Sequence, residues 1–187
     1  FNWETRMVQP TEFEFNFTKY MQRFADAFPN GAPTHVSILL GTNDFGVANG
    51  FNNVDEYLSY YKEAINSIHT YDPNIKVLVC TLPLGPNESM IDDYNWRYTR
   101  FDRNTKLATY YLLKTFDTDE ALSQNTYIAP MHLNLDTTNG FDYKETTVQL
   151  NGVSTNVRVP VNSIHPNNTI GQLQMGDALS SIIQKTR

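Results

Sequence analysis

The sequence predicts an α/β protein whose parallel sheet is covered by helices on both faces. Continuous apolar runs, typical of strands that are buried on both sides, occupy residues 35–40, 75–81 and 126–135. Segments in which apolar residues recur at helical spacing separate these runs. Strands that alternate with helices form parallel sheets, because each helix carries the chain back to the start of the next strand.

The helices are predicted from apolar spacing and from the residues that stop it. The expected helical segments are residues 17–28, 54–68, 92–116 and 170–185. Proline and asparagine clusters follow the first two, at residues 29–31 and 71–74. Near residues 147–159 the pattern becomes an alternation around Asn151-Gly152, which is the strongest short signal for a β-hairpin.

Composition indicates one globular domain and excludes several classes of partner. The chain has 187 residues, of which 40% are hydrophobic and 18% charged, with a net charge of −6. No cluster of Lys and Arg suggests binding to nucleic acid or to an anionic membrane. No run approaches the roughly 18 apolar residues of a membrane span. The single cysteine, Cys80, lies in an apolar run and is expected to be a buried structural thiol.

The first candidate site motif is Gly41-Thr42-Asn43-Asp44, which directly follows the apolar run 36–40. In a parallel sheet this places the motif at the carboxyl end of a strand, where ligand sites form. Glycine lets the backbone bend there, and an asparagine amide in such a turn can stabilise an oxyanion. The alternative is an ordinary turn in which Asn43 and Asp44 hydrogen-bond to the local backbone.

The second motif is Asn162-Ser163-Ile164-His165-Pro166, which continues with Asn167 and a predicted C-terminal helix. Histidine titrates near neutral pH, so His165 is a candidate general base. No pair of histidines has the spacing of zinc ligands. The remaining histidines are interpreted as structural or solvated residues: His35, His69 and His132.

Together the two motifs resemble blocks III and V of the SGNH (GDSL-like) esterase and acetylhydrolase superfamily. The residues that follow the second motif also resemble the family's pattern of a downstream glycine and small residues: Gly171, Met175 and Ala178. The resemblance implies a flavodoxin-like, three-layer α/β/α fold with five parallel strands. It implies ester hydrolysis without a metal or organic cofactor. It assigns Asn43 and Gly41 to the oxyanion site, His165 to the catalytic histidine and Asn162 to its partner.

Two departures from the family concern the catalytic groups. The family's nucleophile is a serine in a Gly-Asp-Ser turn ahead of block III, and the sequence contains no such turn. Ser37, the only serine in the first 40 residues, lies in the middle of a predicted strand. Asn162 stands where the family has Asp; it can accept a hydrogen bond from His165 but supplies no charge. Asp136 and Asp142 are candidates for a substitute carboxylate.

The leading hypothesis is therefore an SGNH-type serine esterase, in which residues 1–187 form a single, N-terminally incomplete domain that lacks the family's first strand. A companion polypeptide carrying Gly-Asp-Ser would supply the nucleophile beside residues 35–40. Asn43 and His165 would then face one cleft, with side chains within about 10 Å. The expected substrate is an acylated carbohydrate or a small ester. We expect a secreted, cell-surface or phage-virion protein rather than a cytoplasmic one.

Two other hypotheses remain open. The chain can be a non-catalytic glycan-binding or structural module of a larger surface or virion protein, in which the hydrolase site has decayed. It can also be a small-ligand α/β protein unrelated to esterases, with the paired motifs arising by coincidence.

Overall fold

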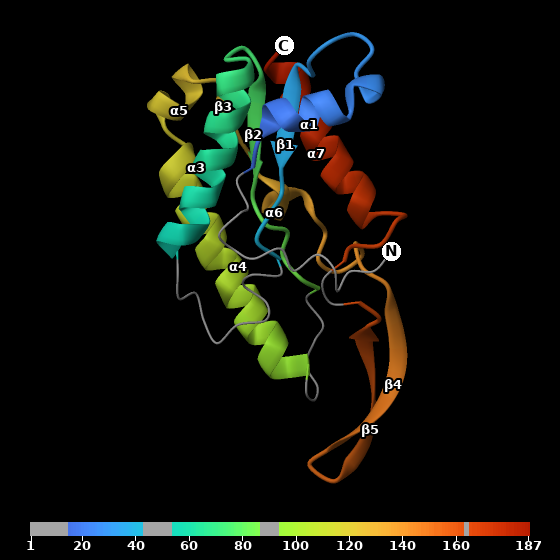
Figure 1. Cartoon of the computed structure of the whole chain (residues 1–187). Helices are drawn as coiled ribbons and strands as arrows, with labels where there is room; N and C mark the ends of the chain where they lie inside the picture. The colour runs from blue at the N-terminus through green and yellow to red at the C-terminus, as the bar shows by residue number, and fades with distance from the viewer. Residues whose placement is uncertain (1–14, 43–53, 87–93, 163–164) are drawn as a thin grey trace.

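The computed structural model describes residues 15–42, 54–86, 94–162 and 165–187. Its centre is a parallel sheet in the order β1-β2-β3, and helices pack on both faces of it (Figure 1). The strands are β1 (His35–Ile38), β2 (Lys76–Cys80) and β3 (Thr126–Ala129). The α/β class with a parallel sheet is therefore confirmed.

The larger apolar core lies between one face of the sheet and three helices. Val77 and Val79 of β2 point into it and are fully buried. The helices are α1 (Phe17–Arg23), α3 (Val54–Tyr71) and α4 (Tyr94–Phe116). Apolar residues recur every three to four positions along α3, so that one stripe faces the strands. The buried members of this stripe are Tyr57, Tyr61, Ala64, Ile65 and Ile68.

The opposite face of the sheet packs against the C-terminal helix. Leu78 and Cys80 alternate with Val77 and Val79 along β2, so they point to this second cluster. The helices on this side are α6 (Met131–Asn134) and α7 (Gly171–Lys185). Because both faces are covered, β2 reads as a continuous apolar run rather than as an alternating one.

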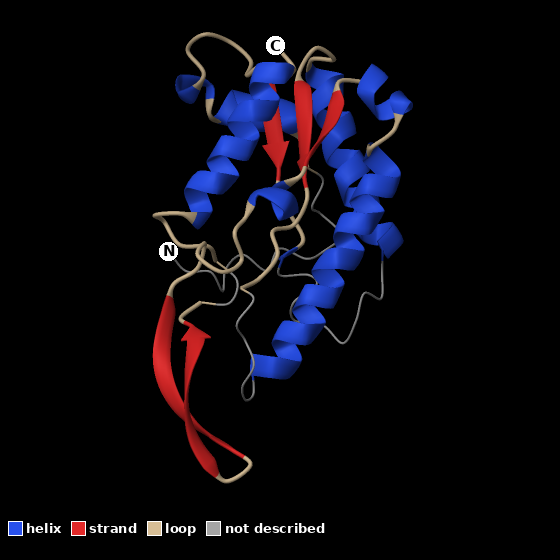
Figure 2. Ribbon diagram, turned by 180° about the vertical axis from the view of Figure 1, so that it is seen from behind, coloured by secondary structure: helices blue, strands red, loops and turns tan. Residues whose placement is uncertain are grey.

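A hairpin projects away from the body of the molecule (Figure 2). Its strands are β4 (Tyr143–Leu150) and β5 (Val153–Pro160), which pair antiparallel. Asn151 and Gly152 form the turn, both with positive φ, at 51° and 81°. This is the conformation that a two-residue hairpin turn demands, so the hairpin prediction is confirmed. The strands extend beyond the predicted residues 147–159 because pairing continues down to Tyr143 and Pro160.

Two predicted elements differ from the structure. The strand expected over residues 126–135 ends at Ala129, because Pro130 lacks an N–H for the ladder and a short helix begins after it. The helix expected over residues 17–28 ends at Arg23 and gives way to a 3₁₀ turn, η3 (Ala25–Ala27). A further short helix, α5 (Asp119–Ser123), was not expected from the sequence.

The sheet is narrower, within the described residues, than the five strands that the family resemblance implies. In the part of the chain that the structure describes, β1 pairs with β2 alone. Leu39 and Leu40, which follow β1, are 40% and 56% exposed. Among the described segments, no helix is both long and apolar enough to cross a membrane.

Candidate active site

The three parallel strands end at one edge of the sheet. β1 leads towards Gly41, β2 leads to Thr81, and β3 leads to Pro130. Ligand sites of open α/β sheets form outside the carboxyl ends of the strands. Both sequence motifs are connected to the segments that leave this edge. The first motif follows β1 directly, and the second lies on a loop that is hydrogen-bonded to the segment after β3.

Gly41 occupies a backbone conformation that favours glycine. It is buried and has a φ of +107°, in the left-handed region where a side chain is strained. The glycine that the first motif requires therefore has a structural reason. Asn43 lies outside the described residues, so its role at an oxyanion and its distance from His165 stay predictions.

Two tyrosines of α3 fix the peptide that enters this turn. The Tyr61 hydroxyl accepts a hydrogen bond from the Leu40 N–H and donates to the Leu40 carbonyl, both at 3.1 Å. The Tyr57 hydroxyl donates to the same carbonyl at 3.2 Å. Sequence reasoning placed both residues in an apolar stripe and missed this role. The available signal was tyrosine, rather than phenylalanine, at two buried positions one helical turn apart.

Asn162 holds the backbone and the ring of His165 together. The Asn162 carbonyl oxygen, Oδ1, accepts a hydrogen bond from the His165 N–H at 2.9 Å. The Asn162 amide nitrogen, Nδ2, lies 3.0 Å from Nδ1 of the His165 imidazole. The predicted contact between these two side chains is therefore present. Both residues are exposed.

The direction of this hydrogen bond differs from the expectation that Asn162 accepts from the imidazole. The amide nitrogen can only donate, so this arrangement fits a neutral ring in which Nδ1 accepts and the proton is carried by Nε2. The amide cannot rotate without cost, because Oδ1 is already used by the His165 N–H. A catalytic histidine of the serine-hydrolase type needs the opposite tautomer, with a lone pair on Nε2. An aspartate at position 162 would favour that tautomer, since it only accepts.

Asn167 anchors the loop that carries His165. Its Oδ1 accepts hydrogen bonds from the N–H groups of Ile170 and Gly171, at 2.9 and 3.0 Å, at the start of α7. Its own N–H donates to the Gly140 carbonyl at 2.7 Å, and its Nδ2 donates to the Asn139 carbonyl at 3.0 Å. Residues after β3 are thus joined to the loop before α7.

Two glycines allow these segments to approach closely. A Cβ added at Gly140 would lie 2.5 Å from the Asp136 carbonyl oxygen. A Cβ added at Gly171 would lie 2.5 Å from the Pro166 Cβ and would also collide with the Gly140 carbonyl. Both glycines are buried. The small residue that follows the histidine motif is therefore needed for backbone packing.

Neither of the two candidate carboxylates contacts His165 in the described part of the chain. The Asp136 carboxylate accepts hydrogen bonds from the N–H groups of Thr138 and Asn139 and from the Asn139 amide, at 2.8 to 3.1 Å. These bonds, led by the Asn139 side chain, lower the pKa of Asp136. The Asp136 carboxylate therefore stabilises the loop of residues 136–139. For Asp142, the backbone carbonyl accepts from the Val161 N–H.

A second histidine, His132, lies at the same edge of the sheet. Its Nδ1 is 2.7 Å from the hydroxyl of Thr81, which is fully buried at the end of β2. The Thr81 hydroxyl also accepts from the His132 N–H at 3.3 Å, so the ring and its backbone share one anchor. Burial lowers the pKa of His132. Sequence reasoning treated His132 as structural, and the contact with a residue 51 positions away leaves no local signal.

Two further observations concern metal ligands and the cysteine of the described residues. No group of three or more His, Cys, Asp or Glu side chains lies close enough there to hold a metal ion. Cys80 is buried in β2, and burial raises the pKa of its thiol to about 12. A thiol that stays protonated at neutral pH is a poor nucleophile, which agrees with the structural role predicted for it.

Comparison with known proteins gives one distant structural likeness. No protein-family model and no curated protein matches the sequence. The solved structure to which this chain is similar is a crystal structure of an acetyl esterase mutant with an acetate ion. The match has a TM-score of 0.48 and 20% sequence identity, and it covers 89% of this chain. The chain spans 66% of that structure, which is less than two thirds of its length. A likeness this distant carries no argument about activity.

Proposed function

We propose that this chain forms the larger part of an SGNH-type serine ester hydrolase. The observation that carries the proposal is the shared edge of the sheet. The Gly41 turn follows β1 there, and the His165 loop is fastened through Asn167 to the residues that follow β3. Two motifs about 120 residues apart in sequence are thereby connected to the segments that follow β1 and β3.

The proposed roles follow from the chemistry of acyl transfer. A serine attacks the acyl carbon, and Asn43 with the Gly41 turn stabilises the oxyanion. His165 removes the serine proton and returns it to the leaving alcohol. Asn162 orients the imidazole. The reaction needs no cofactor. The proposed substrate, an O-acetylated carbohydrate or a related small ester, rests on the family resemblance.

The proposed nucleophile comes from a segment outside these 187 residues. β1 pairs on one side only among the described strands, and exposed Leu39 and Leu40 continue from it. An open strand edge offers unpaired N–H and carbonyl groups to another strand. A strand added beside β1 would end near Gly41, which is where the proposed Gly-Asp-Ser turn has to lie.

One observation favours a second candidate, a non-catalytic glycan-binding or structural module. The Asn162 amide nitrogen faces Nδ1 of His165, which favours a ring proton on Nε2, and within the described residues neither candidate carboxylate contacts the ring. The same wrong-tautomer situation, produced by Asp→Asn in the serine-protease triad, costs about 10⁴-fold in turnover. A decayed site would show this arrangement.

The two candidates are separated by esterase assays on the full-length gene product. The assays use p-nitrophenyl acetate and an acetylated xylo-oligosaccharide. An esterase predicts measurable turnover that His165→Ala abolishes and Asn162→Asp raises, because aspartate restores the Nε2 lone pair and stabilises the imidazolium. Gln184→Ala, an exposed change on α7, serves as the control.

The outcome assigns the protein to one class. Turnover that survives His165→Ala, or that falls with Asn162→Asp while the fold is unchanged by circular dichroism, would refute the proposed roles. Full-length protein without acetyl-ester turnover, in the wild type and in the Asn162→Asp variant alike, would leave the non-catalytic module as the better conclusion.

A further inference from the structure

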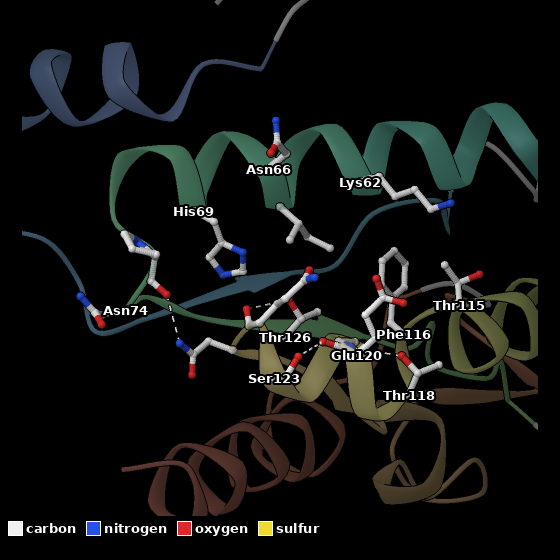
Figure 3. A pocket seen from close by; sticks show the side chains of 15 residues that line it. Lys62, Asn66, His69, Asn74, Thr115, Phe116, Thr118, Glu120, Ser123 and Thr126 are labelled. Carbon is white, nitrogen blue, oxygen red and sulfur yellow. Dashed lines mark hydrogen bonds between the residues drawn. The ribbon is translucent and has the colours of Figure 1, made fainter.

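A groove of about 820 Å³ lies between α3 and α5, away from the candidate active site (Figure 3). Its lining includes Thr126 at the start of β3 and Asn74 just before β2. These positions mark the amino ends of the strands, whereas the Gly41 turn and the His165 loop belong to the carboxyl ends. The volume falls within the range of about 300–1,000 Å³ that is usual for small-molecule sites.

One hydrogen bond between residues far apart in the sequence and one local helix cap hold the walls of this groove. Asn125 has a positive φ of 56°, which turns its amide so that Nδ2 donates to the Pro73 carbonyl at 3.0 Å. Non-glycine residues adopt this conformation seldom, and a cross-link of this kind compensates for its cost. Thr118 accepts from the Ala121 N–H at 3.1 Å and caps α5. These hydrogen bonds fix the backbone segments that form the walls of the groove.

The floor of the groove is small and apolar, and its rim is polar. Ile65 and Phe116 are buried beneath it, at 8% and 6% exposure. In Figure 3, His69 extends from α3 into the space towards α5. Nε2 of the His69 ring donates to the Ile75 carbonyl at 3.1 Å, so in the neutral ring Nδ1 is the acceptor.

Side chains of the rim keep free hydrogen-bonding capacity of both kinds. Within the described residues, the Gln124 amide forms no hydrogen bond with the protein. The Asn66 side chain extends from the opposite side of α3, away from the groove (Figure 3). Lys62 and Glu120 bring one positive and one negative charge to the same groove, and neither has an ion-pair partner in the described part of the chain. The rim therefore combines donors, acceptors and balanced charge.

We propose that this groove binds a neutral, polyhydroxylated ligand, such as a short oligosaccharide. Each ligand hydroxyl both donates and accepts, which matches the Gln124 amide and the His69 ring. An anion would meet the Glu120 carboxylate, and a cation would meet Lys62, so neither charge is favoured over the other. A purely apolar ligand would leave the polar rim without partners, which is costly. The site is separate from the proposed esterase centre and does not depend on it.

The test is binding of defined probes followed by two-dimensional ¹H–¹⁵N NMR. The probes are maltotriose and xylotriose, which are neutral, with sodium phosphate and spermidine as charged comparisons. We expect a neutral trisaccharide to shift the side-chain amide signals of Gln124. Gln124→Ala should weaken its binding by about 2- to 10-fold, the effect of one neutral hydrogen bond. Gln22→Ala, a matched exposed change on α1, should leave the affinity unchanged.

A charge variant distinguishes the ligand classes. Glu120→Gln keeps a hydrogen-bonding group but removes the negative charge, so trisaccharide affinity should change by less than the effect of Gln124→Ala. The proposal is overturned if neither trisaccharide shifts the groove signals. It is also overturned if phosphate or spermidine shifts them in place of the sugars, or if Gln22→Ala and Gln124→Ala weaken binding equally.

Discussion

The hydroxyl of Tyr61 offers a stringent test of how α3 supports the candidate active site. Tyr61→Phe removes the group that accepts from the Leu40 N–H and donates to the Leu40 carbonyl, both at 3.1 Å. The ring itself is 1% exposed and keeps its packing in phenylalanine. The change therefore isolates the two hydrogen bonds from the apolar contribution of the side chain.

The expected magnitude follows from what each partner retains. The Leu40 carbonyl still accepts from Tyr57 at 3.2 Å, whereas the Leu40 N–H loses the Tyr61 hydroxyl. A half-buried donor that loses its partner costs about 1–3 kcal/mol, and loss of one hydrogen bond with its acceptor still satisfied costs about 0.5–1.5 kcal/mol. We expect Tyr61→Phe to lower the free energy of unfolding by about 2 kcal/mol, and Tyr57→Phe by about 1 kcal/mol.

Thermal and urea unfolding monitored by circular dichroism measures this difference. For a chain of this size, 1 kcal/mol corresponds to about 2–4 °C in Tm. Tyr60→Phe is the control on the same helix, since Tyr60 is 54% exposed and, within the described residues, its hydroxyl donates to Glu56 alone, at 2.9 Å. That change should stay within about 0.5 kcal/mol. Equal losses for Tyr57→Phe and Tyr61→Phe, or a larger loss for Tyr60→Phe, would refute the reasoning.

Three further predictions concern other parts of the molecule. In urea unfolding, Gly171→Ala should destabilise the fold by about 1–3 kcal/mol, because the added Cβ would collide with Pro166 and the Gly140 backbone. A Cβ at Gly176 meets nothing within 4 Å, so Gly176→Ala should instead stabilise α7 by about 0.5–1 kcal/mol. Cys80 should resist iodoacetamide in the folded state at pH 8 and react fully in urea, because burial raises its thiol pKa to about 12; labelling at equal rates would contradict that burial. Burial lowers the pKa of His132 below its value in the unfolded chain, so the unfolded state binds more protons than the folded state. The contribution of His132 to the free energy of unfolding is therefore fully present above about pH 6.5 and is lost as the pH falls through the folded pKa. NMR titration of its ring that gives a midpoint above 6.5 would disprove this.

The sequence by itself determined the elements whose signals are local. Continuous apolar runs marked the strands because both faces of the sheet are covered, and the covering helices were readable from apolar spacing. Asn151-Gly152 determined the hairpin turn, since few residue pairs adopt positive φ twice in succession. Gly41 was identified as a turn residue for the same reason, and its φ of +107° agrees. Local conformation depends on adjacent residues, so a single sequence contains it.

The tertiary structure alone decided the contacts that join distant segments. Whether Asn162 donates to His165 or accepts from it depends on which of its atoms the backbone already occupies, and residue type does not encode that. The Thr81–His132 contact and the Asn125–Pro73 cross-link each span about 50 residues. The strand predicted beyond Ala129 was wrong for a different, local reason that the sequence contains, because Pro130 lacks the N–H that the ladder needs. The contacts between distant segments arise when the packed core brings remote side chains together, because their energies depend on spatial neighbours rather than on sequence neighbours.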